Sequence, residues 1–344
     1  MGKILREKVC KKLVLLILSM VSMLFLTTPT SSLALTISPP RLEFNVNPGQ
    51  RVEDIIKIFN ETKDPLNIFT SAANFVAKPG ETGEPEFLFP KDGEEGLAAW
   101  IDIEKGPITI LPNEQKIIPF TVRVPPTADP GGHYAAIFFS PSPPPGEGGV
   151  VGVIGKLGAL VLFRVSGDIK EEGGLTEFSL KDNKKAYNHL PVDFVIRFEN
   201  TGTVHLKPQG DIFIKNIFGR ESAIVEVNKP KIGTGGNVLP NSIRRFEASW
   251  DKKEIRESEP TGFLEKLKTE IDNFAFGRYR ADLILDYGTL GKKSQATLIF
   301  WVIPWRLTVL TIIGLLILIF LLIISIKRYN RWIIKKALEQ MRSQ

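Results

Sequence analysis

The chain has 344 residues, of which 43% are hydrophobic, and its 44 Lys and Arg against 38 Asp and Glu give a formal net charge of +6. This length allows about two domains, and the apolar fraction is sufficient for buried cores. The composition excludes intrinsic disorder and collagen-like repetition. The basic balance alone would fit a nucleic-acid-binding protein, but the excess positive charge lies at the two ends of the chain.

Residues 1–34 have the pattern of a secretory signal peptide. A basic segment covers residues 1–12, an uncharged apolar run follows over residues 13–26, and small residues lead up to Ala34. This order predicts cleavage between Ala34 and Leu35. The alternative is an uncleaved signal anchor, for which the apolar run is short, because a helix needs about 20 residues to cross a bilayer.

The region from residue 35 to residue 305 alternates as β-strands do. Val192, Phe194, Ile196 and Phe198 share one phase of their segment, and residues 118–124 repeat the pattern. Alternation with one polar face is typical of an antiparallel sheet that packs on one side. Because Pro- and Gly-rich turns recur at short spacing, we expect an all-β fold of tandem immunoglobulin-like antiparallel β-sandwiches.

An internal repeat predicts that there are two such sandwiches. The strand ending in Asn60 matches the strand ending in Asn200, and the Leu-Pro-Asn turn at residues 111–113 matches the turn at residues 239–241. The order is the same in both halves, with a boundary near Gly167. We therefore expect one sandwich over residues 35–166 and a second over residues 167–305.

Tyr134 and Tyr279 open corresponding strands in the two halves. In immunoglobulin-like domains such a tyrosine can form a tyrosine corner, with its hydroxyl bonded to the backbone of the preceding loop. The alternative is an ordinary, partly buried strand tyrosine.

Three insertions interrupt the repeat. Residues 76–98 form a polar excursion around a short strand at residues 87–89. A Pro-rich loop at residues 140–146 leads to an apolar strand over residues 150–165, which is either buried on both faces, the favoured interpretation, or an edge awaiting a partner strand.

The third insertion, residues 260–274, has its apolar residues on one helical face. This helix either covers one end of the second sandwich or lies on the membrane. The first interpretation is favoured, because the polar face is not enriched in Lys and Arg.

The C-terminal end predicts a single transmembrane helix over residues 306–326, because residues 307–326 are uncharged and long enough to cross a bilayer. A short basic tail follows over residues 327–344. The expected anchors at the membrane interface are Trp301, Trp305, Arg306, Lys327 and Arg328. Since positive flanks stay in the cytoplasm, we expect the tail inside and the sandwiches outside the cell membrane.

The charge of the region between these ends is negative, because the signal peptide, Arg306 and the tail carry more positive charge than the whole chain. A nucleic-acid partner is therefore not expected. The expected partner of the apolar helix is the lipid bilayer.

Residues that could carry chemistry are few. Cys10, the only cysteine, lies in the predicted signal peptide, so thiol catalysis and zinc–thiolate sites are excluded from the mature chain. The three histidines, His133, His189 and His205, are dispersed, and acid pairs such as Glu171-Glu172 lie beside glycines and are expected to be solvated. We expect no catalytic residue, metal or cofactor, although a hydrolase built on two distant carboxylates stays open as an alternative.

Several motifs of the first half occur together in one known family. They are Ser38-Pro39-Pro40-Arg41-Leu42-Glu43-Phe44, Pro48-Gly49-Gln50, the strand ending in Asn60, Ile110-Leu111-Pro112-Asn113-Glu114, Val122-Arg123-Val124-Pro125 and Gly132-His133-Tyr134-Ala135-Ala136-Ile137. Together they resemble the N-terminal domain of the WxL-interacting protein family, also called DUF916, of Gram-positive cell surfaces. The layout of signal peptide, two sandwiches, one span and a basic tail is also similar. The resemblance implies binding of peptidoglycan by the first domain and of a surface protein by the second, and it transfers no binding residues.

Two functions follow from these observations. The first is a membrane-anchored surface protein without catalytic activity that binds peptidoglycan or another surface protein. The alternative is a PapD-like assembly chaperone, in which the strand over residues 150–165 would act by strand complementation. The C-terminal span argues against the alternative, because the periplasmic pilus chaperones are soluble.

Overall fold

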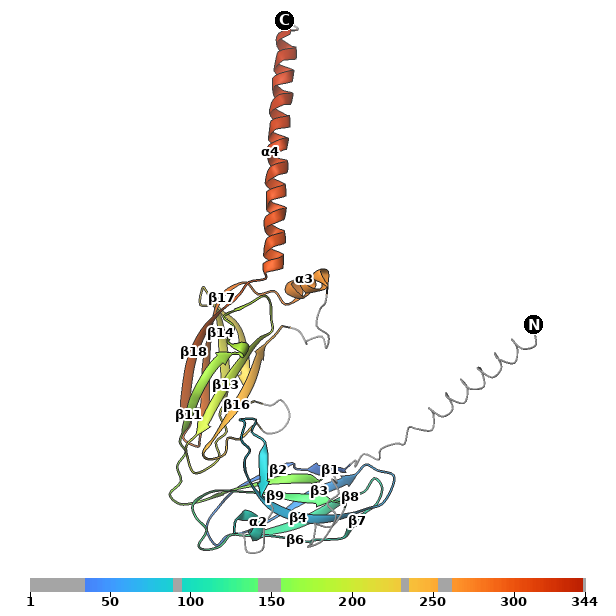
Figure 1. Cartoon of the computed structure of the whole chain (residues 1–344), viewed down its shortest axis with the longest axis vertical. Coiled ribbons are helices and arrows are strands. Elements are labelled where there is room, and N and C mark those ends of the chain that lie inside the picture. Colours follow the sequence, from blue (N-terminus) through green and yellow to red (C-terminus); the bar gives the residue numbers. More distant parts are fainter. Residues whose placement is uncertain (1–34, 89–94, 142–155, 230–234, 253–261, 343–344) are drawn as a thin grey trace, which may run out of the picture.

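The computed structural model describes residues 35–88, 95–141, 156–229, 235–252 and 262–342. The described chain is L-shaped (Figure 1). Helix α4 (Trp305–Arg342) and the second β-sandwich form the long arm, and the first sandwich lies across its far end. We name residues 35–166 domain 1 and residues 167–305 domain 2. The predicted fold class of two tandem β-sandwiches is confirmed, whereas the predicted signal peptide lies outside the described residues.

Domain 1 packs two sheets against each other. The first contains, in spatial order, β1 (Leu35–Ser38), β3 (Arg51–Asn60), β8 (Gln115–Arg123) and β6 (Ile101–Ile103). The second contains, in spatial order, β2 (Arg41–Val46), β10 (Leu157–Val165), β9 (Gly131–Ser140), β4 (Leu66–Ala77) and β5 (Pro85–Leu88). The short strand β7 (Ile108–Ile110) also pairs with β4, and the short helix α2 (Leu97–Trp100) lies beside this sheet. The alternation at residues 118–124 buries Ile118, Phe120, Val122 and Val124 in the core between the sheets.

Domain 2 has the same plan. A three-stranded sheet of β11 (Gly173–Leu180), β13 (Val192–Asn200) and β16 (Ser242–Trp250) faces a five-stranded sheet of β12 (Ala186–Tyr187), β18 (Lys292–Val302), β17 (Gly277–Tyr287), β14 (Gln209–Asn216) and β15 (Glu221–Val227). A 3-10 turn, η1 (Lys181–Asn183), follows β11. The apolar phase of β13 is fully buried in a core of its own, separate from that of domain 1.

The sequence repeat has a structural counterpart at Asn60 and Asn200, which end equivalent strands and are both fully buried. The Asn60 side-chain amide donates to the carbonyls of Asp64, Ile110 and Leu111 at 2.9–3.2 Å. The Asn200 amide donates to the carbonyls of Val204 and Val238 at 2.8 Å, and its oxygen accepts from the Gly202 N–H at 2.9 Å. Each asparagine therefore ties the end of its strand to the turns around it.

The repeated Leu-Pro-Asn turns also adopt the same conformation, because Asn113 has a φ of 56° and Asn241 a φ of 55°. Asparagine tolerates this left-handed region better than most residues do. The two domains therefore share turn chemistry as well as strand order.

The insertions are placed as follows. β10 pairs with β9 on one side and, from Leu160 to Val165, in parallel with β2 on the other, so this strand is interior to its sheet, as favoured. The short strand expected at residues 87–89 is β5, at residues 85–88. Residues 142–155, with most of the Pro-rich loop and the start of the predicted strand, lie outside the described residues.

Only Tyr279 forms a tyrosine-corner contact, because its hydroxyl donates to the carbonyl of Phe276 at 3.4 Å. The same expectation is wrong for Tyr134. Its buried hydroxyl makes no bond to the preceding loop among the described residues but lies beside the His205 backbone, and its ring packs on Phe75 and on His205 of domain 2. The alternative therefore holds for Tyr134, which is a partly buried strand tyrosine at the contact between the two domains.

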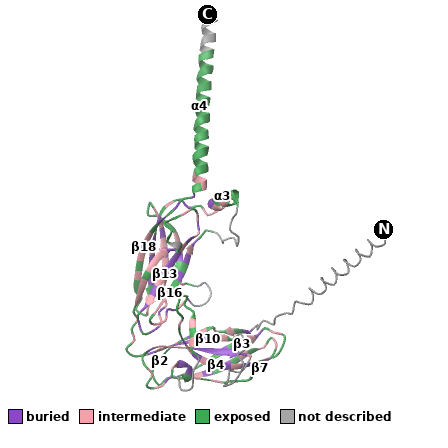
Figure 2. Cartoon of the chain, in the orientation of Figure 1, coloured by how far each residue is buried: buried purple, intermediate pink, exposed green. Residues whose placement is uncertain are grey.

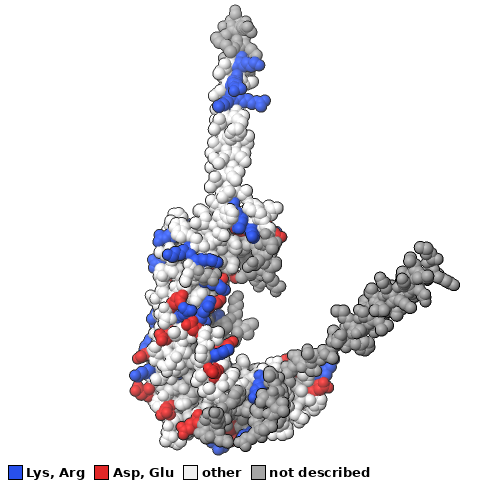
Figure 3. Space-filling view, viewed as in Figure 1, with Lys and Arg blue, Asp and Glu red and all other residues white. Residues whose placement is uncertain are grey.

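Two residues separate the end of β18 from the start of α4. Its segment from Trp305 to Lys335 is long and apolar enough to cross a membrane, with none of its most apolar stretch buried against the rest of the chain (Figure 2). The residues between Arg306 and Lys327 carry no charge. Figure 3 shows α4 with an uncharged stretch and basic residues beyond it. These properties are consistent with a single-pass membrane anchor.

Candidate interaction site

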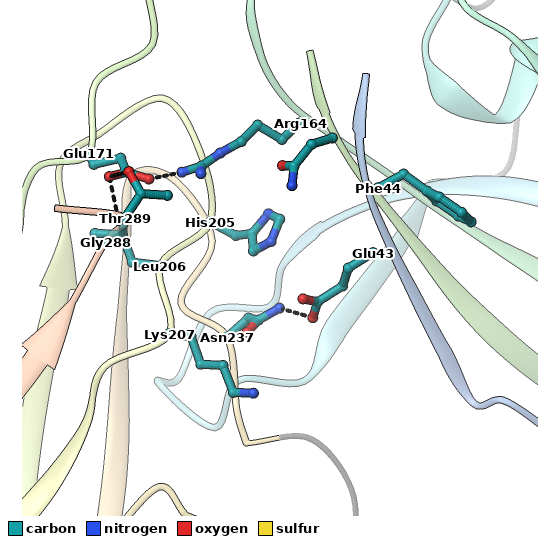
Figure 4. A pocket seen from close by; sticks show the side chains of 11 residues that line it. Glu43, Phe44, Arg164, Glu171, His205, Leu206, Lys207, Asn237, Gly288 and Thr289 are labelled. Carbon is teal, nitrogen blue, oxygen red and sulfur yellow. Dashed lines mark hydrogen bonds and ion pairs between the residues drawn. The ribbon is translucent and has the colours of Figure 1, made fainter. Parts of the chain in front are cut away.

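A cavity of about 340 Å3 lies where the two domains meet (Figure 4). Domain 1 contributes side chains from β2 and β10. Domain 2 contributes Glu171, the segment 205–207, Asn237 and the turn between β17 and β18. This region is the candidate interaction site, because it brings together the ionic and polar groups that join the domains.

One side of the cavity holds the ion pair between Arg164 at the end of β10 and Glu171 at the start of domain 2. Their side chains are only 15% and 9% exposed. The Glu171 carboxylate also accepts from the Thr289 N–H at 2.7 Å and the Thr289 hydroxyl at 2.8 Å. Burial alone would raise the pKa of Glu171, but the bonds from Thr289 and Arg164 outweigh it and lower the pKa below its ordinary value.

This geometry corrects the sequence expectation for the Glu171-Glu172 pair. Glu172 is exposed, as expected for a solvated loop acid, but Glu171 is not solvated. The reason is tertiary: Arg164 and Thr289 approach Glu171 from opposite sides of the domain junction (Figure 4).

The other side of the cavity carries a second set of contacts between β2 and the loop before β16. The Asn237 side-chain amide donates to the Glu43 carboxylate at 2.9 Å, and the Arg41 guanidinium donates to the Gly235 carbonyl at 2.9 Å. Arg41 lies 3.0 Å from Glu43 and is mostly buried. Both carboxylates of the cavity, Glu43 and Glu171, are therefore held by partners across the junction.

A third contact is made by the hairpin between β4 and β5, which reaches domain 2 (Figure 1). The Arg197 guanidinium of β13 donates to the Glu81 carboxylate at 2.7 Å, and the Arg245 N–H of β16 donates to the Glu81 carbonyl at 2.8 Å. Arg197 also pairs with Glu177 of β11. One arginine thus joins the hairpin of domain 1 to the smaller sheet of domain 2.

An apolar cluster supports these polar contacts. The sheet face of domain 1 that points away from its core buries Ala73, Phe75, Ala136, Phe138 and Leu162, and Leu239 of domain 2 packs on this cluster. Burial of apolar surface adds a non-directional attraction to the directional ionic contacts.

The linker between the domains is also constrained. Gly167 has a φ of 142°, and a Cβ there would meet Pro130 at 2.5 Å, so only glycine fits this position. The Gly132 N–H donates to the Thr203 carbonyl at 2.9 Å. Together, linker, cluster and ion pairs fix the angle between the two sandwiches.

His205 lies inside this junction, with its ring 5.7 Å from the Tyr134 ring. Its Nδ1 is buried without a hydrogen-bond partner among the described residues. Burial, together with the positive charges of Arg164 and Arg41, lowers the pKa of His205 to about 4, although Glu43 and Glu171 act in the opposite direction. His205 is therefore neutral at pH 7, and its protonation would add a further positive charge to a junction that already holds Arg41 and Arg164.

The other histidines stay apart from one another. A ring nitrogen of His133 lies 2.8 Å from the Asp129 carbonyl, and a ring nitrogen of His189 lies 2.6 Å from the Leu190 carbonyl. Among the described residues, no group of three or more His, Cys, Asp and Glu side chains could hold a metal ion.

The predicted membrane anchors lie at the two ends of the apolar stretch of α4. Trp301 is the second-to-last residue of β18 and Trp305 begins α4, and both are nearly half exposed. The Arg306 guanidinium stacks on the Trp305 ring at 4.7 Å. Lys327 and Arg328 are exposed on α4. Of the predicted cleavage residues, Leu35 is the buried first residue of β1, and Ala34 lies outside the described residues.

Sequence reasoning missed the junction, including Arg164, Glu171, His205 and Glu81. These residues are 7 to 118 positions from their partners, and neither spacing nor periodicity signals such pairs.

Comparison with known proteins gives no sequence-based identification. No protein-family model matches the chain, and no curated protein matches it. The chain is similar in structure to the class 5 fimbriae chaperone CfaA, at 13% identity, with 77% of this chain and 98% of the other covered and a TM-score of 0.35. It is also similar to the YadV chaperone, at 9% identity, 77% and 99% coverage and a TM-score of 0.33. The Pseudomonas aeruginosa CupB2 chaperone is 11% identical, with 78% of this chain and 100% of the other covered and a TM-score of 0.32. Similarities at this level carry no argument about function.

Proposed function

We propose that the chain is a non-enzymatic, single-pass protein of the cell membrane that presents domain 1 to another surface protein. The observation that carries this proposal is the fixed junction at one end of domain 2, with the apolar helix α4 leaving from the other end (Figure 1). Such an arrangement holds domain 1 at a set distance and angle from the bilayer. The basic residues after the apolar stretch support a cytoplasmic tail and external domains.

The outer face of the first sheet of domain 1 offers a surface that fits a protein partner. Ile55 of β3 lies directly opposite Pro119 of β8, and Ile117 lies two residues from Pro119 on the same face. Ile55 is 38% and Ile117 is 52% exposed. We name Ile55, Ile117 and Pro119 the outer patch. Apolar patches on a polar surface are typical of protein-binding sites.

The proposed absence of catalysis is supported by the junction cavity. Its two carboxylates, Glu43 and Glu171, already accept hydrogen bonds from Asn237, Thr289 and Arg164. A hydrolase would need a carboxylic acid and a carboxylate that both face a substrate.

Site-specific photo-cross-linking of the full chain in its native membranes tests this function. A photoreactive side chain is placed at Ile117 and, as a matched control, at Ile224, which is 51% exposed on β15 of domain 2. We expect one protein to be cross-linked from position 117 and not from position 224, and the I55K substitution to abolish it. If no partner protein is cross-linked from position 117, and the I55K substitution does not change the cross-linking result, the proposal is contradicted.

Two further measurements separate the alternatives. Co-sedimentation of the detergent-solubilised chain with purified peptidoglycan would show that the partner is the polymer implied by the resemblance to the WxL-interacting proteins. Loss of surface subunits from cells that lack the chain would favour the assembly chaperone instead. In that case a donated strand from residues 160–165 would have to displace β2.

A further inference from the structure

The exposed aromatic side chains of the ectodomain are confined to one place. Among the described residues of domains 1 and 2 they are Phe218, Phe263, Phe274, Phe276, Trp301 and Trp305, with exposed fractions between 44% and 84%. Trp301 is the second-to-last residue of β18, which leads into α4 at Trp305, and Phe276 directly precedes β17, whose first residues pair with the end of β18. Phe218 lies in the turn after β14, whose last residue pairs with Tyr279. All six therefore lie at the end of domain 2 from which α4 leaves.

Helix α3 (Phe263–Asp272) turns its apolar face away from the protein. Phe263, Leu264 and Ile271 are 56%, 76% and 54% exposed. None of the apolar side chains of α3 belongs to the core cluster of domain 2. The interpretation favoured from the sequence, a helix that covers one end of the second sandwich with its apolar face, is therefore wrong, because none of these side chains joins the core of domain 2.

What α3 buries instead is an ionic contact with α4. Glu270 is its one fully buried residue, and its carboxylate accepts from the Arg306 guanidinium at 2.8 Å and from the Leu307 N–H at 3.0 Å. Both partners lie in the first turn of α4, where backbone N–H groups have no partner within the helix. The contact fixes α3 across the axis of α4 at the level where the apolar stretch begins (Figures 1 and 2).

We propose that α3 lies in the headgroup region of the bilayer that α4 crosses, with Phe263, Leu264 and Ile271 inserted toward the acyl chains. The inference rests on the proposed role of α4 as the membrane anchor. Interfacial helices bury their apolar face about 5–10 Å into this boundary, and aromatic side chains prefer the same depth. Phe218, Phe274, Phe276 and Trp301 then extend the contact beside the helix.

The charges of α3 indicate whether it binds anionic or neutral phospholipids. The helix carries Lys266 and Lys268 against Glu265, Glu270 and Asp272, so it has no excess of positive charge for anionic headgroups. Insertion is therefore driven by apolar burial, and a neutral phospholipid surface is sufficient.

Depth-dependent fluorescence quenching tests the inference on the full chain in phosphatidylcholine vesicles. In a C10S background, an environment-sensitive fluorophore is attached at L264C, at L290C or at L316C. Leu290 is the matched control, because it is 82% exposed at the opposite end of domain 2, and Leu316 reports insertion of α4. Quenchers are attached to the lipids either near the headgroup or near the chain end.

We expect the label at position 264 to be quenched at least several-fold more than the label at position 290, most strongly by the shallow quencher. Addition of phosphatidylglycerol should leave this ratio unchanged. Equal, weak quenching at positions 264 and 290, with strong deep quenching at position 316, would overturn the inference and leave the anchor intact. Absence of quenching at position 316 would overturn the anchor and the inference together, and a signal at position 264 only with phosphatidylglycerol would overturn the neutral-lipid claim.

Discussion

Replacement of Glu171 by alanine should release the angle between the two sandwiches. The substitution leaves the guanidinium of Arg164, which is 15% exposed, without its counter-charge and removes the acceptor of two hydrogen bonds from Thr289. Removal of one partner of a buried ion pair typically costs about 3–5 kcal/mol. Because about 1.4 kcal/mol corresponds to a tenfold change, the ratio of docked to undocked domains should fall by a hundred- to several-thousand-fold.

Distances between spin labels on the two domains measure this change. In a C10S background, labels at I117C on β8 and I224C on β15 report the angle between domains in the full chain, since both positions are exposed and lie outside the junction. We expect one narrow distance distribution for the unsubstituted junction and a broad one for E171A. The matched control is E172A, which alters the exposed neighbouring acid and should keep the narrow distribution. Equal distributions for E171A and E172A would refute the role assigned to Glu171.

Three further predictions concern the junction, the repeat and α4. Burial holds the pKa of His205 at about 4, below its ordinary value of 6.5, so the folded junction binds fewer protons than the opened one. Docking of the two domains should be fully stable above pH 6.5 and should weaken by up to about 3 kcal/mol as the pH falls toward 4. The distribution of the same spin-label distances should broaden at the lower pH. The H205Q substitution should remove this pH dependence between pH 6.5 and 4.5. The N200A substitution should lower the free energy of unfolding by about 2–4 kcal/mol, because it leaves buried backbone groups unpaired. Calorimetry should then show a lower Tm. An unchanged Tm would argue against the role of Asn200 at the end of its strand. The E270A substitution should free α3 from α4 and raise the rate of hydrogen exchange in α3, whereas K268A, which alters an exposed α3 side chain, should not.

The elements that the sequence predicts best are those defined by local chemistry. Alternation along β8 and β13 predicts the buried faces, because side chains of a strand point to opposite sides in turn. The matching asparagines Asn60 and Asn200 predict the repeat, and the bond that each donates to the carbonyl four residues later explains why an amide stands at the end of each strand. The apolar run of α4 is visible because crossing a bilayer requires a long uncharged segment.

The elements that the sequence does not predict depend on contacts between distant residues. Glu171 sits beside glycines like a solvated loop acid, and only the fold brings Arg164 and Thr289 to it. The periodicity of α3 predicts an apolar face but not the direction in which it points. That direction is set by Glu270, the buried acid of α3 that binds the first turn of α4.

The topology of the chain in intact cells is the most direct test of its proposed role. A membrane-impermeant maleimide is applied to cells that carry, in a C10S background, either I117C in domain 1 or I333C near the end of α4, both of which are exposed. We predict labelling of I117C in intact cells and of I333C only after permeabilisation. Labelling of I333C but not of I117C in intact cells would contradict an external pair of sandwiches held by α4.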